Sequence, residues 1–149
     1  MLDADSGRIG AFSAGAPTPV LAVPTSGSAT YQGLALGFHA DATGASSLAF
    51  ASVRVAADFA ARTLAFTTSN TTITADLSAY SPAPGLDLTG TLRYAAGTNT
   101  FGGDIMSANG MSGRADGRFY GPGAEEVGGV FETRGAGTEV YGGAFGGRR

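Results

Sequence analysis

From Ser28 to the end of the chain, apolar residues recur at every second position, and short turn sequences interrupt the pattern. The alternation is clear in residues 86–94 and again in residues 111–120. A two-residue period places one face of a strand on a core and the other in water. Helical periodicity is scarce, so the sequence predicts an all-β fold. In 111–120 the alternating rows are Met111, Gly113, Ala115, Gly117 and Phe119 against Ser112, Arg114, Asp116, Arg118 and Tyr120.

The turn sequences divide this region into eight expected strands. Short links between consecutive strands imply antiparallel neighbours, because parallel neighbours need a crossover of a dozen or more residues. Only residues 70–85 form a longer loop. Eight amphipathic strands must hide two sheet edges, and closure into a barrel does so. We therefore predict one eight-stranded antiparallel up-and-down β-barrel over 28–149, with strands near 28–39, 46–57, 62–69, 86–94, 99–106, 111–120, 127–133 and 138–146.

Glycine supplies 25 of the 149 residues, and many glycines fall inside expected strands. Glycine normally weakens a strand, since it packs no side chain. In a narrow, strongly coiled barrel it leaves room where strands bend and where a large side chain lies opposite. We assign this role to Gly33, Gly90, Gly103, Gly113, Gly117, Gly129 and Gly143.

Residues 1–27 are rich in Ala, Ser and Pro, with Pro17, Pro19 and Pro24 spaced through them. Proline cannot donate to a strand ladder and fixes φ, so this stretch is predicted to be an extended arm or tether. The apolar run 20–23 offers the alternative that the segment docks on the barrel.

Composition removes several function classes. The chain has no cysteine, no lysine and one histidine, which excludes disulfides, thiolate metal sites, cysteine nucleophiles and lysine Schiff bases. A net charge of −3 with scattered arginines argues against a nucleic-acid partner. No apolar window reaches the length of a membrane helix, and the polar row of 111–120 argues against a membrane-spanning barrel. We expect a non-enzymatic binding module without a cofactor or metal.

The last third carries two linked motifs: GRFYGPGAEEVGGVF at 117–131 and GGAFGGRR at 142–149. Together they resemble the C-terminal β-barrel signature of the transferrin-binding protein B family. Physically, Gly121 and Pro122 should end one strand, and 124–126 should form a single helical turn with Glu125 and Glu126 near its N-terminus. Phe145 should fill the barrel mouth and fix the last strand. The positions that carry the signature are Phe119, Tyr120, Gly121, Pro122, Glu125, Gly128, Gly129, Phe131 and Phe145.

The resemblance implies a bacterial outer-membrane surface lipoprotein, or a secreted relative, that captures an iron source for a partner transporter. Its partner would be a protein or a small iron-bearing ligand, and a lipid anchor would be attached outside this sequence. The family's large two-lobed receptors pair each barrel with a handle domain, whereas this length accommodates one barrel. Related barrels capture haem or bind complement regulators, so the fold leaves the ligand open. A structural assembly or adhesion module, contacting other surface proteins through the Pro-rich arm, is the alternative.

Three residues are candidates for ligand or partner binding. His39, the sole imidazole, could be a haem or metal ligand, or a surface histidine at a strand end. Tyr80 and Tyr31 could supply a recognition surface, because tyrosine is enriched at interfaces. Tyr80, in the long loop, is the first to test; its alternative is to pack on the barrel end. Glu125 and Glu126 are adjacent and point different ways, so they do not form a catalytic carboxylate pair.

Overall fold

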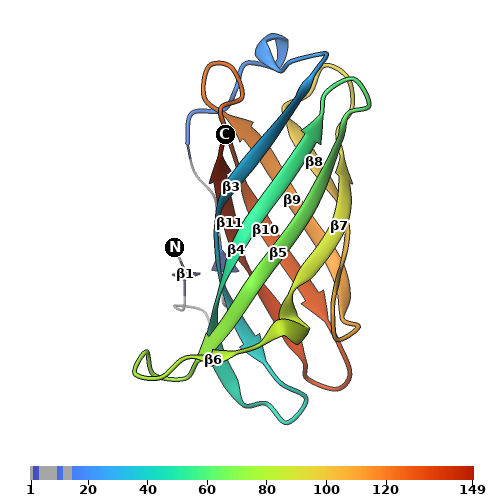
Figure 1. The fold of residues 1–149 in the computed structure, drawn as a ribbon. Helices are drawn as coiled ribbons and strands as arrows, with labels where there is room; N and C mark the ends of the chain where they lie inside the picture. The colour runs from blue at the N-terminus through green and yellow to red at the C-terminus, as the bar shows by residue number, and fades with distance from the viewer. Residues whose placement is uncertain (1, 4–9, 12–14) are drawn as a thin grey trace.

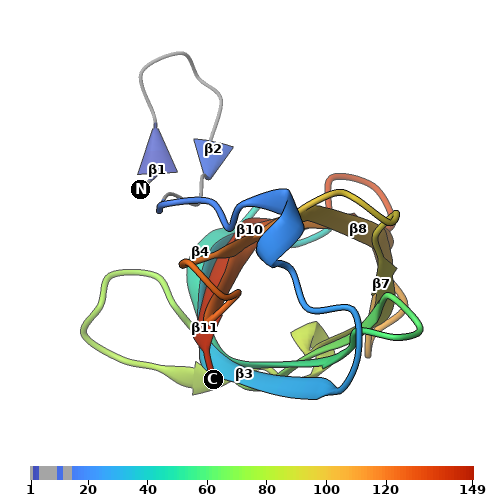
Figure 2. The same cartoon turned by 90° about the horizontal axis from the view of Figure 1, so that it is seen from above.

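A computed structural model describes residues 2–3, 10–11 and 15–149. It confirms the all-β prediction: eight long antiparallel strands close into a barrel, seen from the side in Figure 1 and from above in Figure 2. Five shorter elements lie before or between them: β1 (Leu2–Asp3), β2 (Gly10–Ala11), the 3₁₀ helix η1 (Val20–Ala22) and, after β5, the strand β6 (Ser81–Pro82) with the 3₁₀ helix η2 (Pro84–Leu86). The barrel strands are β3 (Ser28–Ala40), β4 (Ser46–Asp58), β5 (Thr63–Thr74), β7 (Leu88–Arg93), β8 (Thr100–Ser107), β9 (Ser112–Tyr120), β10 (Glu126–Arg134) and β11 (Val140–Arg148).

Each barrel strand pairs with the barrel strands before and after it in sequence, as the short links predicted. Closure comes from pairing of the first barrel strand, β3, with the last, β11, over nine residue pairs from Gln32↔Arg148 to Ala40↔Val140. This seam removes both free edges of the sheet. The short strand β6 adds a ninth strand outside the barrel, beside β5.

The predicted long loop 70–85 is shorter in the structure. Strand β5 continues to Thr74, because the ladder with β4 resumes after a register shift between Phe50 and Ser52. Opposite this shift, Asn70 has φ +54°, the left-handed conformation that asparagine tolerates better than most residues. The chain then forms β6 and η2 before β7 begins at Leu88, two residues later than predicted.

The interior faces of β7 and β9 match the predicted apolar rows, and Leu88, Leu92, Ala115 and Phe119 are completely buried. Strand β3 departs from the expected pattern of apolar inside and polar outside. Its inner row is small apart from Tyr31 and His39, while Leu34 on the outer row is 73% exposed. The reason is space, since a side chain at the inward Gly37 would meet the backbone of β11 and the ring of Tyr141.

The strand glycines have the predicted steric role. A Cβ atom at Gly113 would lie 1.8 Å from the Glu132 carbonyl oxygen, and one at Gly33 would lie 1.9 Å from the Gly146 carbonyl oxygen. Both obstacles are backbone of a neighbouring strand, so no side-chain rotation relieves them. The close approach of the strands therefore depends on these positions having no side chain.

The two ends of the barrel differ chemically. Loops 41–45, 75–87, 108–111 and 135–139 form one end, which we call the Tyr80 end. Loops 59–62, 94–99 and 121–125 form the other, which we call the Tyr94 end. Inside the Tyr94 end, aromatic rings surround Phe119, whose nearest ring centroid is that of Phe101 at 5.2 Å. Toward the Tyr80 end the interior becomes hydroxyl-rich, with Thr68, Thr71, Thr74, Ser107 and Thr133 buried.

Residues 15–27 lie across the Tyr94 end (Figure 2). This part of the predicted arm is therefore docked on the barrel, which was the alternative to a free tether. The Thr18 amide donates to the Phe119 carbonyl at 3.0 Å, and its hydroxyl donates to the Gly121 carbonyl at 2.7 Å. The Asn99 side-chain amide donates to the Thr18 carbonyl at 2.7 Å, and Val23 is buried in the core. Most of the earlier residues of the arm lie outside the described part of the chain.

The signature loop 121–125 corrects one prediction. Residues 124–126 form no helical turn, because Ala124 has φ +61° and β10 already begins at Glu126. Instead, the Glu125 carboxylate accepts a hydrogen bond from the Gly123 amide at 2.8 Å and so closes a tight turn. Phe145 is buried inside the barrel, where its ring packs edge-on against Phe66 at 4.9 Å. Within the described residues, no helix has the length and hydropathy needed to cross a bilayer.

Candidate functional site

The loops of the Tyr80 end carry acidic side chains and no basic ones. Their residues include four carboxylates and neither arginine nor lysine. Negative charges concentrated at one end of a protein attract a positively charged partner and disfavour a negatively charged one. The acidic side chains are Asp41, Asp76, Asp87 and Glu139.

Residues 75–80 stand away from the barrel wall at this end, as the light green loop of Figure 1 shows. Local hydrogen bonds fix the shape of the loop: the Leu77 amide donates to the Thr74 hydroxyl at 2.9 Å, and the Ser78 hydroxyl and amide donate to one Asp76 oxygen at 2.6 and 2.9 Å. The Ser78 hydrogen bonds lower the pKa of Asp76 below its ordinary value. The loop is therefore built around a charged, internally bonded turn.

At the tip of this turn, Leu77 has φ +66° and is 56% exposed. The left-handed conformation costs roughly 1–2 kcal/mol for a residue with a Cβ atom. An apolar side chain held in solvent at such a cost is a reason to look for function at this position. Sequence reasoning missed Leu77, because nothing in its neighbours predicts a positive φ for leucine.

Tyr80 combines the two roles considered from the sequence, a recognition surface and packing against the barrel end. Its ring lies edge-on to Phe50 of the barrel wall, with centroids 5.9 Å apart, so the base of the loop is anchored there. The side chain is nevertheless 53% exposed. Tyr80 and Leu77 thus present two large side chains on one exposed loop.

His39 lies at the same end, at the close of β3, and is largely buried rather than exposed at the surface. Its Nε2 is 3.6 Å from an oxygen of Glu139, and its ring stands edge-on to Tyr141. Within the part of the chain that the structure describes, the Nε2 atom makes no hydrogen bond. Among the described residues, no three His, Asp or Glu side chains are grouped so as to hold a metal ion.

Tyr31 lies at the opposite end and is completely buried, away from any surface that a protein partner could touch. Its hydroxyl donates to the carbonyl of Ala124 at 2.6 Å and so ties β3 to the signature loop. Burial raises the pKa of Tyr31 to about 12. The structure therefore separates Tyr31 from Tyr80 and His39 by the length of the barrel.

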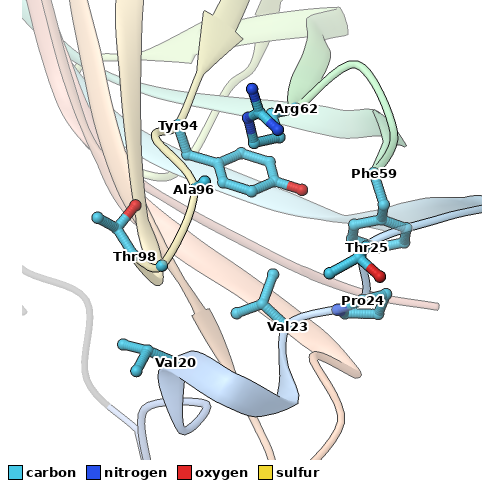
Figure 3. A pocket seen from close by; sticks show the side chains of 10 residues that line it. Val20, Val23, Pro24, Thr25, Phe59, Arg62, Tyr94, Ala96 and Thr98 are labelled. Atoms are coloured by element: carbon cyan, nitrogen blue, oxygen red, sulfur yellow. The ribbon is translucent and has the colours of Figure 1, made fainter.

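A small cleft of about 90 Å³ lies at the Tyr94 end, between the docked segment 20–25 and the loops that follow β4 and β7 (Figure 3). The hydroxyl of Tyr94 points into the space between Arg62 and the docked segment. Sequence reasoning did not find this cleft, because one of its walls comes from residues about 70 positions before Tyr94.

Comparison with known proteins gives one family. The family model described as the C-lobe and N-lobe β-barrels of transferrin (Tf)-binding protein B matches residues 23–149, which include the whole barrel. A comparison with curated protein sequences finds no match.

Solved structures agree with the family model. A variant of transferrin-binding protein B from Haemophilus parasuis aligns with a TM-score of 0.68 at 19% identity, over 89% of this chain and 28% of that one. The isotype 1 protein from serogroup B Neisseria meningitidis aligns with a TM-score of 0.62 at 25% identity, again over 89% and 28%. A structure described as a surface lipoprotein aligns with a TM-score of 0.63 at 14% identity, over 91% and 66%.

This chain spans little more than a quarter of the transferrin-binding protein B chains that it resembles, so the comparison concerns one barrel of each. In this chain the matched region forms one closed barrel, with its first strand paired to its last. The match of the family model to most of the chain and the shared barrel lead to the same conclusion: the chain belongs to the family of the C-lobe and N-lobe β-barrels of transferrin-binding protein B.

Proposed function

We propose that this chain is the barrel module of a non-enzymatic bacterial surface protein that captures a protein partner through its Tyr80 end. Membership of a family of binding proteins supports a capture role, and the family's description makes an iron-carrying transferrin the first partner to test. The observation that carries the choice of end is the loop 75–80, which exposes Leu77 and Tyr80 from a hydrogen-bonded turn.

The chemistry of this loop fits a protein partner. Tyrosine is one of the residue types enriched among the side chains that dominate the binding energy of interfaces, and a rigid loop loses less entropy on binding than a free one. The carboxylates around the loop favour a partner with a basic patch next to an apolar pocket. Asp76 already accepts two hydrogen bonds from Ser78, so its charge is held in place rather than free to follow a partner.

The proposal is tested by measuring binding of the full chain to immobilised vertebrate transferrins, iron-loaded and iron-free, by biolayer interferometry. We expect Tyr80→Ala to weaken binding by about 30-fold, as for an interface anchor worth about 2 kcal/mol. Leu77→Gly should also weaken binding. It should leave stability nearly unchanged, because relief of the positive φ offsets the added freedom of glycine in the unfolded chain.

The control is Leu34→Ser, which removes a more exposed leucine from the outer wall of β3, away from the loop. Unchanged binding of this variant, together with weak binding of the loop variants, would assign capture to the Tyr80 end. The assignment fails if the loop variants bind every transferrin as the parent does. A chain that binds no transferrin would remove transferrin as the partner.

A second candidate function is assembly with other surface proteins, and one observation favours it. Leu34 and Leu36 on the outer row of β3 are 73% and 39% exposed, beside an outer row of β11 that is mostly glycine and alanine. A flat apolar wall of this kind suits contact with another protein. Light scattering on the isolated chain tests it, since a monomer at high concentration would count against self-assembly.

A further inference from the structure

The cleft at the Tyr94 end contains a hydrogen-bonding group without a partner. Tyr94 is 9% exposed, and its hydroxyl oxygen is buried with no hydrogen-bond partner among the described residues. The ring is fixed in place by an edge-on contact with Phe119 at 5.3 Å. Buried hydroxyl groups are nearly always paired in folded proteins, because an unpaired one loses its hydration without compensation.

A positive charge without an ion pair in the described part of the chain lies beside the Tyr94 ring. Figure 3 shows the Arg62 side chain beside the Tyr94 ring, and within the described residues its guanidinium makes no ion pair. Arg62 has φ +56°, and its carbonyl accepts the amide of Tyr94 at 3.3 Å, which joins the two residues. At the end of β4, the Asp58 carboxylate accepts a hydrogen bond from the Ala61 amide at 2.9 Å.

Both groups donate hydrogen bonds. A guanidinium has no acceptor, and burial raises the pKa of Tyr94, so its hydroxyl keeps its proton at neutral pH. Two neighbouring donors, one of them charged, are the usual partners of a carboxylate. A neutral molecule would gain no charge–charge attraction from Arg62.

The rest of the cleft is mainly apolar, with Thr25 and Thr98 as its other polar lining residues. Val20, Val23 and Phe59 line it from the docked segment and the loop after β4. A volume of about 90 Å³ holds roughly six to nine water-sized spheres, which sets the size of an occupant. That volume suits a carboxylate on a short branched aliphatic group, and any longer part of a ligand would lie outside the cleft.

We propose that this cleft binds a carboxylate carried on a short aliphatic group, with its oxygens between the Tyr94 hydroxyl and the Arg62 guanidinium and its aliphatic part against Val23 and Phe59. The ligand reaches the hydroxyl when residues 20–22 of the wall shift. Leu21 in η1 is 96% exposed and Val20 is 46% exposed, so little apolar burial is lost when this part moves and Val23 stays buried. The site lies at the opposite end from the Tyr80 loop and does not depend on the proposed capture function.

Two kinds of ligand carry a carboxylate on a short aliphatic group: a free short-chain carboxylic acid, and the C-terminal residue of a peptide. Amide-resolved chemical shifts of the isotope-labelled full chain are followed during titration with isovalerate, N-acetyl-leucine and their neutral amides. We expect the two acids to give saturable shifts at Val23, Phe59 and Gly97, and the amides to give much weaker ones. Tighter binding of N-acetyl-leucine indicates a peptide terminus, whereas tighter binding of isovalerate indicates the free acid.

Three variants test the assigned contacts. Arg62→Gln and Tyr94→Phe should each weaken isovalerate binding about tenfold or more, as expected for loss of a charge-assisted hydrogen bond. Tyr94→Phe removes only an unpaired oxygen, so it should fold at least as stably as the parent. Arg93→Gln is the matched control, because it removes an arginine charge from the outer wall at the position before Tyr94. It should change the affinity for isovalerate less than about twofold.

The proposal is overturned by equal binding of isovalerate and isovaleramide, because charge would then play no part. It is also overturned if no saturable shifts arise at the cleft, or if Arg93→Gln weakens binding as much as Arg62→Gln. The last result would mean a general attraction of the acid to the protein surface.

Discussion

Replacement of Gly143 by alanine tests the steric account of the barrel, with Gly146 of the same strand as its internal control. A Cβ atom at Gly143 would lie 2.2 Å from the Leu36 carbonyl oxygen and 2.5 Å from the Cα atom of Gly37, both backbone of β3. A Cβ atom at Gly146 would find its nearest neighbour, the Val127 carbonyl oxygen, at 3.8 Å. The same chemical change is thus blocked at one position and free at the other.

The cost at Gly143 follows from this geometry. An ordinary contact with the Leu36 oxygen requires β3 and β11 to separate by more than an ångström, which stretches the hydrogen bonds of the closing seam. Overpacking costs about 1–3 kcal/mol, and each lost ladder bond adds about 0.5–1.5 kcal/mol. Alanine returns about 0.4–1 kcal/mol by restricting the unfolded chain. We expect Gly143→Ala to lower the free energy of unfolding by about 3 kcal/mol, and Gly146→Ala to raise it by about 0.5 kcal/mol.

The assay is urea unfolding of the parent and both variants, with the free energy of unfolding extrapolated linearly to water. Thermal midpoints should differ between the variants by roughly 7–14 °C, given about 2–4 °C per kcal/mol for a domain of this size. A Gly143→Ala protein within about 0.5 kcal/mol of the parent, or an equal loss in both variants, would refute the claim that close backbone approach is why these glycines are needed.

Three further outcomes are expected. Tyr31→Phe leaves the buried Ala124 carbonyl without its donor and should lower the free energy of unfolding by about 1–3 kcal/mol, whereas Tyr94→Phe should not lower it; urea unfolding of both compares them directly. Burial raises the pKa values of Tyr31, Tyr94 and Tyr141, with Tyr31 at about 12, so the folded state holds these protons when the unfolded chain has released them. Their contribution is complete below pH 10 and is lost as the pH rises toward 12, which circular dichroism on alkaline titration should record as unfolding; constant stability through this range would contradict it. Hydrogen bonds from Thr43 and Ser78 lower the pKa values of Asp41 and Asp76, so these loop bonds should persist as the pH falls to 3.8 and break below it; amide shifts of Thr43 and Ser78 that titrate above 3.8 would show the bonds to be absent.

The barrel itself was predictable because its determinants are local. Two-residue alternation fixed the strands, and short turns fixed their antiparallel order. The glycine positions followed from the same reasoning, since strands of a narrow barrel approach closely. The inward and outward faces of β3 were not predictable in this way, because Gly37 is inside to admit the ring of Tyr141 from a strand about 100 residues later.

The candidate sites were less accessible to sequence reasoning for two physical reasons. Tyr80 could be singled out because it lies in the long loop. The exposure of Leu77 depends on a left-handed backbone conformation that the sequence around a leucine does not predict. The Tyr94 cleft forms only when residues 20–25 dock on loops far along the chain. Conversely, Tyr31 has the residue type of an interface anchor, but its strand position turns it into the core.

The closing seam between β3 and β11 is the feature on which both ends of the molecule depend, because it fixes where every loop lies. Amide hydrogen exchange of the full chain tests it most directly, with the β9–β10 ladder as the internal reference. We predict that paired amides of β3 and β11 exchange as slowly as those of β9 and β10, through global unfolding only. Seam amides that exchange orders of magnitude faster than the β9–β10 amides would mean an open sheet, and would contradict the closed barrel.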